Sequence, residues 1–323
     1  MKIAIAGAGM SGAYLFRRLI DEGYKDIDLF DVKKTNSCGC RPCAWGFAPV
    51  AETFELIAKV TDPARFEMQR SDVISFDGVD VRSSNMLTMN KPALIREMIG
   101  HAEVKEGAID PTKYDRVIDA TGVSRAYLPP IKDDHIAQCT QYRVRSEQAL
   151  GFWFRTSTVG YEWCFPLGGD EYHIGIGSLK SDVRSYRPST DKDDRELSVK
   201  VQCKCHSSVR LTSPFFSQPF MKDNVVGIGE SIGAVAPLAS DGNLYAMQCG
   251  EMLMENWEDL DRYSEQVLKR YDWMRKERRG LEKLMEGRTP SLPEALTMRG
   301  HLKSVGVEIK TGQIIRLLRN MSR

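Results

Sequence analysis

Hydrophobic residues near the start of the chain predict a strand, a glycine turn, a helix and a second strand. Residues 2–6 form the short apolar run of a buried strand, and apolar positions between residues 15 and 20 recur at helical spacing. Gly23 is predicted to end this helix. Residues 27–31 form a second short strand that ends in an acid. This order of elements is typical of a nucleotide-binding unit.

The turn between the first strand and the helix has the sequence Gly7-Ala8-Gly9-Met10-Ser11-Gly12. In such a turn the first glycine allows a sharp change of direction, the second lets the backbone approach a pyrophosphate, and the third lets helix and strand pack closely. The phosphates would lie at the positive N-terminus of the helix. Asp31 comes nineteen positions after Gly12, close to the separation at which an acid meets a ribose hydroxyl. The unit predicts an adenine dinucleotide without distinguishing FAD from NAD; the alternatives are an empty turn and a solvated Asp31.

The pattern then predicts alternating helices and strands up to residue 122. A helix is expected over residues 52–60, and Asn90-Lys91-Pro92 is expected to open another, since proline suits an early helical position. Residues 114–119 form a strand that enters the small-residue turn Ala120-Thr121-Gly122.

From residue 141 to residue 178 the pattern changes to alternating, aromatic segments, which indicate antiparallel strands. The parallel pattern returns at residues 224–229, a helix follows at residues 242–250, and beyond Asn256 the chain is charged and helical. The predicted fold class is therefore α/β, with a discontinuous Rossmann-like domain, an inserted antiparallel-sheet domain and a helical C-terminus. The predicted boundaries are 1–60, 91–128 and 220–255 for the nucleotide domain, 61–90 and 129–219 for the inserted substrate domain, and 256–323 for the C-terminal region.

Composition narrows the classes of function. The 323 residues include 45 basic and 44 acidic side chains, so net charge gives no reason to expect nucleic acid as a partner. No apolar run approaches the ~20 residues that span a bilayer, and the N-terminus lacks the features of a signal peptide. We therefore expect a cytoplasmic protein, with contact to a membrane surface still open. Eight cysteines in such a protein are more often thiols, metal ligands or redox groups than a disulfide framework.

Four further segments carry a resemblance to a known family. They are Asp119-Ala120-Thr121-Gly122, Gly227-Ile228-Gly229-Glu230-Ser231-Ile232-Gly233 with Asp241-Gly242-Asn243, Tyr161-Glu162-Trp163-Cys164-Phe165-Pro166, and Arg41-Pro42-Cys43-Ala44-Trp45-Gly46. With the first glycine turn, these segments resemble the flavoproteins of the para-hydroxybenzoate hydroxylase type, and within them the archaeal geranylgeranyl reductases. The resemblance spans roughly residues 1 to 250. Glu230 stands where the family usually has aspartate.

The resemblance implies a split FAD site and a neighbouring lipid cavity. Cys43 is the expected catalytic residue, and the aromatic strand is expected to contact the substrate through Tyr161, Trp163, Phe165 and Pro166. The residues expected around FAD are Gly7, Gly9, Met10, Ser11, Gly12, Asp31, Val32, Ala44, Val104, Ala120, Thr121, Gly122, Gly229, Glu230, Asp241, Gly242 and Asn243. Each role has a plainer alternative: core packing for the aromatic residues and Cys43, and a helix-start acid for Glu230.

The implied activity is saturation of double bonds in geranylgeranyl chains of lipids or their precursors. Hydride would come from reduced flavin, and a proton from Cys43 or a bound water; a thiol near its ordinary pKa of ~8.5 is protonated at neutral pH. An isoprenoid lipid is the expected partner, together with an external electron donor, either ferredoxin or NAD(P)H.

Two rival functions stay open. One is a monooxygenase or halogenase on the same fold. The other is a redox or electron-transfer protein in which Cys38, Cys40, Cys43, Cys203, Cys205 and His206 bind a metal or form a disulfide, although these spacings match no standard site and no metal is expected. The basic, apolar stretch 312–323 favours a docked helix, with binding to anionic lipid as the alternative.

Overall fold

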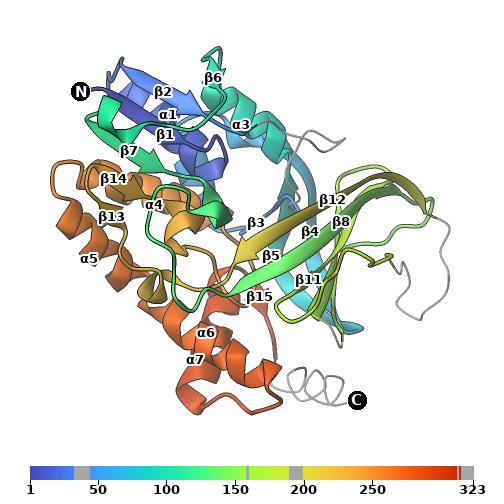
Figure 1. The fold of residues 1–323 in the computed structure, drawn as a ribbon. Helices are drawn as coiled ribbons and strands as arrows, with labels where there is room; N and C mark the ends of the chain where they lie inside the picture. The colour runs from blue at the N-terminus through green and yellow to red at the C-terminus, as the bar shows by residue number, and fades with distance from the viewer. Residues whose placement is uncertain (33–43, 158–159, 189–198, 311–312, 314–323) are drawn as a thin grey trace.

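A computed structural model describes residues 1–32, 44–157, 160–188, 199–310 and 313. Within these residues the protein is built on two sheets, with helices packed around the smaller one and below the larger one (Figure 1). Among the described residues, no helix is long and apolar enough to cross a membrane.

The smaller sheet is parallel apart from one edge strand. Its order is β13-β14-β7-β1-β2-β6, and β13 runs antiparallel to β14. Ile3 and Ile5 on β1 pair with β2 on one side and β7 on the other, so β1 is buried throughout. The strands are β1 (Ile3–Ala6), β2 (Ile27–Phe30), β6 (Val104–Lys105), β7 (Arg116–Asp119), β13 (Met221–Lys222) and β14 (Val225–Gly227).

Four helices belong with this sheet and form one hydrophobic core with it. The amphipathic pattern behind the glycine turn folds as predicted, and Gly23, with φ +90°, follows the end of that helix. Asn90 caps its helix by accepting a hydrogen bond from the Ala93 amide at 3.1 Å. The helices are α1 (Met10–Asp21), α2 (Ala51–Ala58), α3 (Lys91–Ile99) and α4 (Asn243–Glu255).

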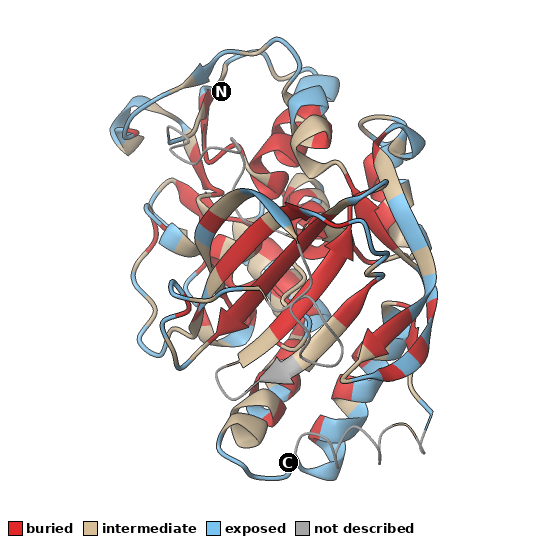
Figure 2. Cartoon of the chain, turned by 90° about the vertical axis from the view of Figure 1, so that its right-hand side faces the viewer, coloured by how far each residue is buried: buried red, intermediate tan, exposed pale blue. Residues whose placement is uncertain are grey.

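The larger sheet has the order β12-β8-β11-β10-β9-β4-β5-β15, with β3 also paired to β5. All of its pairs are antiparallel except β4 with β9. Buried residues dominate the strands in the middle of this sheet (Figure 2). The strands are β3 (Gly46–Phe47), β4 (Glu67–Phe76), β5 (Val79–Met89), β8 (Ile136–Arg145), β9 (Trp153–Ser157), β10 (Gly160–Pro166), β11 (Glu171–Ser178), β12 (Lys200–Arg210) and β15 (Val307–Glu308).

The C-terminal region is helical, as predicted, and a short strand follows its third helix. Its helices are α5 (Leu260–Arg270), α6 (Asp272–Met285) and α7 (Leu292–Ser304), and β15 then pairs with β5 of the larger sheet. The predicted fold class is confirmed: a Rossmann-like parallel sheet, an inserted and mostly antiparallel sheet, and a helical C-terminus. The predicted domain boundaries stay predictions.

Candidate functional site

The three glycines of the first turn have different surroundings. A Cβ added to Gly12 would lie 1.8 Å from the carbonyl oxygen of Gly7, and one added to Gly7 would lie 2.3 Å from that of Ala120. Both positions require glycine for packing, and Gly7 also has φ +103°. A Cβ added to Gly9 would meet nothing within 4 Å. The backbone at the middle glycine is therefore open on the side where a side chain would lie.

Two helix N-termini meet beside this open position. Neither α1, which begins after Gly9, nor α4, which begins after Gly242, has a side-chain cap or an acid in its first turn. A Cβ added to Gly229 would lie 2.9 Å from Ser11 on α1 and 3.7 Å from Ala246 on α4, so the two helices converge there. The uncapped amides of α1 and the positive ends of both helices suit the phosphates of a dinucleotide. At α4 the Asp241 carboxylate already accepts from the Asn243 amide. The described residues fit such a group.

The second and third motif turns are joined to each other by hydrogen bonds. The Asp119 carbonyl, at the end of β7, accepts from the Ile228 amide at 3.0 Å and from the Ser231 hydroxyl at 2.6 Å. The Ala120 amide in turn donates to the Ala6 carbonyl at 2.8 Å, which ties both turns to β1. Thr121 and Gly122 follow directly, and Gly122 has φ +66°. Three segments far apart in the sequence therefore meet at one edge of the parallel sheet.

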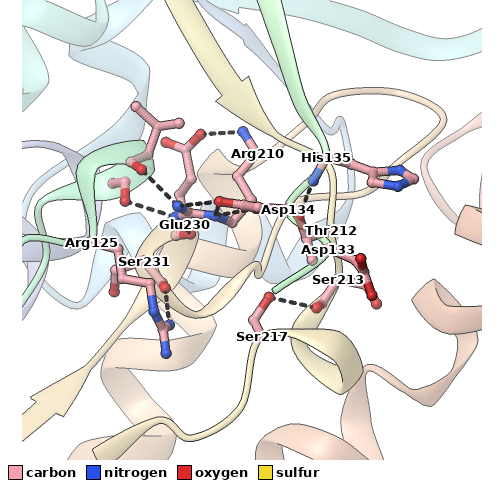
Figure 3. Close-up of polar contacts among 12 residues, drawn as sticks. Arg125, Asp133, Asp134, His135, Arg210, Thr212, Ser213, Ser217, Glu230 and Ser231 are labelled. Carbon is pink, nitrogen blue, oxygen red and sulfur yellow. Dashed lines mark hydrogen bonds and ion pairs between the residues drawn. The ribbon is translucent and has the colours of Figure 1, made fainter. Parts of the chain in front are cut away.

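Arg210 connects these turns to the larger sheet, and the sequence analysis missed it. From the end of β12 its amide donates to Glu230 Oε1 at 2.8 Å (Figure 3). Its guanidinium donates to the carbonyls of Gly122 at 3.1 Å, Glu230 at 3.0 Å and Val123 at 2.7 Å. Asp134 accepts from Arg210 Nε at 2.9 Å. Glu230, predicted to contact the cofactor, thus already has a partner in Arg210.

The electrostatics of this cluster favour ionised groups in the interior. Burial alone would raise the pKa of Asp134, but hydrogen bonds from Arg210 and Thr212 outweigh it and hold that pKa below its ordinary value. A second buried guanidinium, Arg125, donates to the Ser231 carbonyl, and burial followed by repulsion from Arg210 lowers its pKa to about 10. Arg125 therefore remains charged at neutral pH. The turns that follow β7 and β14 are therefore fixed by charged hydrogen bonds.

Asp31 lies beside the first turn, as its spacing predicted. The strand β2 ends at Phe30, whose carbonyl accepts from the Gly7 amide at 2.8 Å, and Asp31 follows directly. Asp31 Oδ1 accepts from the Val32 amide at 3.0 Å. Val32 and Val104 have exposed side chains at this edge of the sheet. Their roles toward a cofactor stay predictions.

Aromatic side chains of β10 form the face predicted to contact substrate. The rings of Tyr161 and Trp163 lie 5.6 Å apart between centroids. A Cβ on Gly175 of β11 would lie 2.4 Å from the Trp163 ring, and one on Gly177 would lie 3.6 Å from the Tyr161 ring. Gly175 therefore makes room for the Trp163 ring, whereas a Cβ on Gly177 would make ordinary contact with Tyr161.

The four predicted substrate residues differ in how far they are buried. Trp163 and Phe165 are buried in an apolar cluster, and Tyr161 is half-buried at its margin. Pro166 is buried too, but side chains alternate along a strand, which places it on the opposite face from Phe165. Tyr161 thus has the best access among the four.

The described end of the cysteine loop lies on this aromatic face. Cys43 itself is outside the described residues, but Ala44, Trp45 and Gly46 follow it. A Cβ added to Gly46 would lie 2.4 Å from the Phe165 ring, and the Gly46 carbonyl accepts from Asn243 Nδ2 at 2.8 Å. Gly46 therefore connects the segment after Cys43 to the aromatic strand and to the start of α4.

His173 on β11 was also missed by the sequence analysis. Its ring packs edge-on against Trp45, with centroids 4.6 Å apart, and only 2% of the residue is exposed. Burial lowers the pKa of His173 to about 3, so its imidazole is neutral at physiological pH. Its Nδ1 atom has no hydrogen-bond partner among the residues that the structure describes. Trp45, which follows Ala44, therefore packs against an uncharged imidazole ring.

A buried carboxylate supports the segment before α4. Glu277 on α6 is fully buried; it accepts from the Leu238 amide at 3.2 Å and contacts His301 Nδ1 at 2.7 Å. The other ring nitrogen of His301 lies 3.1 Å from the Tyr245 hydroxyl on α4. Nearby, burial raises the pKa of Asp241, which accepts from the Asn243 amide at 3.1 Å. The C-terminal helices thus position the start of α4.

Replacing Glu277 by glutamine is expected to lower the free energy of unfolding by about 2 kcal/mol, because the amide cannot hold both Leu238 and His301 as the carboxylate does. Urea denaturation measures this change. The exposed Glu265→Gln on α5 is the control and should change stability by less than about 0.5 kcal/mol. Equal effects of the two substitutions would contradict a supporting role for Glu277.

Within the described ranges, no group of three or more His, Cys, Asp or Glu side chains could hold a metal ion. Cys203 lies on β12 of the larger sheet, as do Cys205 and His206, whose Nδ1 is 2.9 Å from the Thr140 hydroxyl. Cys38, Cys40 and Cys43 fall outside those ranges.

Comparison with solved structures places this architecture among known folds. A geranylgeranyl bacteriochlorophyll reductase-like protein from Thermoplasma acidophilum superposes with a TM-score of 0.70 and 16% identity, over 98% of this chain and 95% of that one. The flavin-dependent halogenase CmlS superposes with a TM-score of 0.65 and 12% identity, over 98% of this chain and 69% of that one. The chain has the fold of the FAD-dependent oxidoreductases.

Sequence comparisons agree with this flavoprotein fold. No protein-family model matches the chain. An uncharacterized protein of Methanocaldococcus jannaschii is 24% identical over 336 aligned positions, which cover 88% of this chain and 90% of that protein. The digeranylgeranylglycerophospholipid reductase of Methanococcus vannielii is 25% identical over 162 residues, which cover 45% of this chain and 40% of the reductase. The resemblance to geranylgeranyl reductases inferred from the motifs is confirmed.

Proposed function

We propose that this protein is an FAD-dependent oxidoreductase that saturates carbon–carbon double bonds of isoprenoid, geranylgeranyl-type chains in lipids or their precursors. The observation that carries the proposal is the junction at Gly46. There the segment following Cys43, the aromatic face at Phe165 and the start of α4 at Asn243 are in direct contact. A cofactor at the N-termini of α1 and α4 would thus lie next to an apolar surface suited to a prenyl chain.

The protein's residues would bind the cofactor, orient the substrate and exclude water from the site. Gly9 and the first amides of α1 would hold the pyrophosphate, and Asp31 the ribose. Reduced FAD would supply the hydride that is added to one alkene carbon. The aromatic face keeps the alkene in place, and Cys43 is the candidate that gives a proton to the other carbon. The neutral ring of His173 places no charge near the apolar chain.

The direct test is the mass of the product. Purified protein loaded with FAD and reduced with dithionite is incubated with a geranylgeranyl lipid, and the lipid is then analysed by mass spectrometry. Two hydrogens gained for each reduced double bond support the proposal. An unchanged lipid mass, with the flavin fully reduced, would refute it. Ferredoxin and NAD(P)H are then compared as electron donors in place of dithionite.

Replacing Tyr161 by alanine is expected to raise KM for the isoprenoid about tenfold, because its ring is the accessible end of the aromatic face. The Kd for FAD should stay unchanged. Tyr161→Phe keeps the ring and is the matched control, with a KM close to that of the parent protein. An unchanged KM in the alanine variant would place the substrate elsewhere.

A flavin monooxygenase or halogenase is the second candidate, favoured by the superposition of the halogenase over nearly the whole chain. Such an enzyme consumes oxygen in proportion to its product. Oxygen uptake coupled to a hydroxylated or halogenated aromatic compound would favour it over the reductase.

A further inference from the structure

Helix α7 presents an outer surface that combines leucines with cations. Leu292 is 72% exposed and Leu296 is 57% exposed. Arg299 and Lys303, further along the helix, are exposed as well. Positions 292, 296, 299 and 303 fall within an arc of about 60° because an α-helix has 3.6 residues per turn. These four side chains are the α7 outer stripe.

The α7 outer stripe carries no negative charge. Glu294 is the only acid in the sequence of α7, and it is buried. Its carboxylate faces inward, where it accepts from Lys283 Nζ at 2.7 Å and from the Ser291 amide at 2.6 Å. Neither Arg299 nor Lys303 has a side-chain hydrogen bond or ion pair with any described residue. The stripe therefore offers two unpaired positive charges beside two exposed leucines.

The opposite side of α7 faces the functional site. His301 contacts Glu277 at 2.7 Å and Tyr245 at 3.1 Å, at the base of α4. Leu302 packs against the apolar cluster that contains Trp163 and Phe165. The width of α7 thus separates the outer stripe from these contacts. Figure 1 shows α7 at the edge of the molecule, below the larger sheet.

We propose that the α7 outer stripe docks the protein onto an anionic lipid bilayer. The leucines would enter the headgroup region while Arg299 and Lys303 contact lipid phosphates. Two leucines flanked by two cations lack the packed apolar centre that a stable protein partner requires. This inference rests on the proposed function, because such a bilayer would present the isoprenoid chain next to the aromatic face.

The test measures sedimentation of the FAD-loaded full-length protein with vesicles of phosphatidylcholine, alone or mixed with phosphatidylglycerol. The parent protein should bind the mixed vesicles more tightly. The double variants Leu292→Ser with Leu296→Ser and Arg299→Gln with Lys303→Gln should each lose at least tenfold in affinity. Val201→Ser on β12 removes a residue that is 50% exposed outside α7, and it should bind like the parent.

Two results would overturn the docking proposal. One is a parent protein that fails to bind mixed vesicles, and the other is unchanged binding by the double leucine variant. If light scattering shows a changed molecular mass for the double leucine variant while its vesicle binding is unchanged, the stripe would instead be an interface with a second copy of the chain.

Vesicle binding is measured without turnover, so its result does not depend on the proposed reductase activity. A protein that binds vesicles but leaves the lipid unreduced would refute only the reductase. One that reduces detergent-dispersed lipid but ignores vesicles would refute only the docking.

Discussion

Replacing Gly12 by alanine is expected to destabilise the protein by at least about 3 kcal/mol, whereas replacing Gly9 by alanine is expected to remove FAD binding from an intact fold. At Gly12 the new methyl group would lie 1.8 Å from the Gly7 carbonyl oxygen, so the backbone must move. At Gly9 it would meet no protein atom within 4 Å, and the backbone, at φ −79° and ψ −166°, accepts alanine. The methyl group would instead occupy the space of the pyrophosphate.

Urea denaturation and FAD titration distinguish the two effects. Gly9→Ala should change the free energy of unfolding by less than about 0.5 kcal/mol and raise the Kd for FAD at least about 100-fold. Gly300→Ala, in open space on α7, is the control; it should leave FAD binding unchanged and stabilise its helix by up to about 1 kcal/mol. Unchanged FAD affinity in Gly9→Ala would place the cofactor elsewhere.

Replacing Arg210 by methionine is expected to lower the free energy of unfolding by about 3 to 5 kcal/mol and to weaken FAD binding. The substitution leaves Asp134 charged and without its main partner in the interior. It also removes the donors that hold the carbonyls of Gly122, Val123 and Glu230, so the second and third turns lose their shared anchor.

The matched control for Arg210 is Arg184→Met, because Arg184 is paired with Asp182 on the surface and 77% exposed. This variant should keep close to the parent's stability and bind FAD normally, because an exposed ion pair contributes little. If Arg210→Met does not fold, Arg210→Lys, which keeps one charge and fewer donors, should fold with an intermediate loss of FAD affinity. FAD affinity equal to that of the parent in a folded Arg210 variant would contradict the anchoring role.

Features encoded by neighbouring residues could be predicted from the sequence. The first strand, the glycine turn, α1 and β2 follow from short-range periodicity and from the steric requirement of Gly12, whose Cβ would meet the nearby Gly7 carbonyl. The fold class follows from the change between helical and alternating patterns. Each of these signals is carried by residues that lie close together in the sequence.

Features that depend on distant partners could not be predicted. In the sequence, Arg210 is one of many basic residues. Its six hydrogen-bond acceptor atoms, which include both oxygens of Asp134, come together only where β12 meets the turns that follow β7 and β14. Gly175 is not part of a turn motif in the sequence. It makes room for the Trp163 ring, and this depends on the register between β10 and β11. Burial of His173 likewise depends on Trp45, which is more than one hundred residues earlier.

The central claim is that reduced flavin in this protein passes its electrons to an isoprenoid double bond and not to oxygen. The most direct measurement is flavin absorbance after anaerobic mixing of the reduced protein with a geranylgeranyl lipid. The account predicts that the lipid alone reoxidises the flavin, at a rate that falls in Tyr161→Ala. Flavin that stays reduced until oxygen is admitted would contradict it.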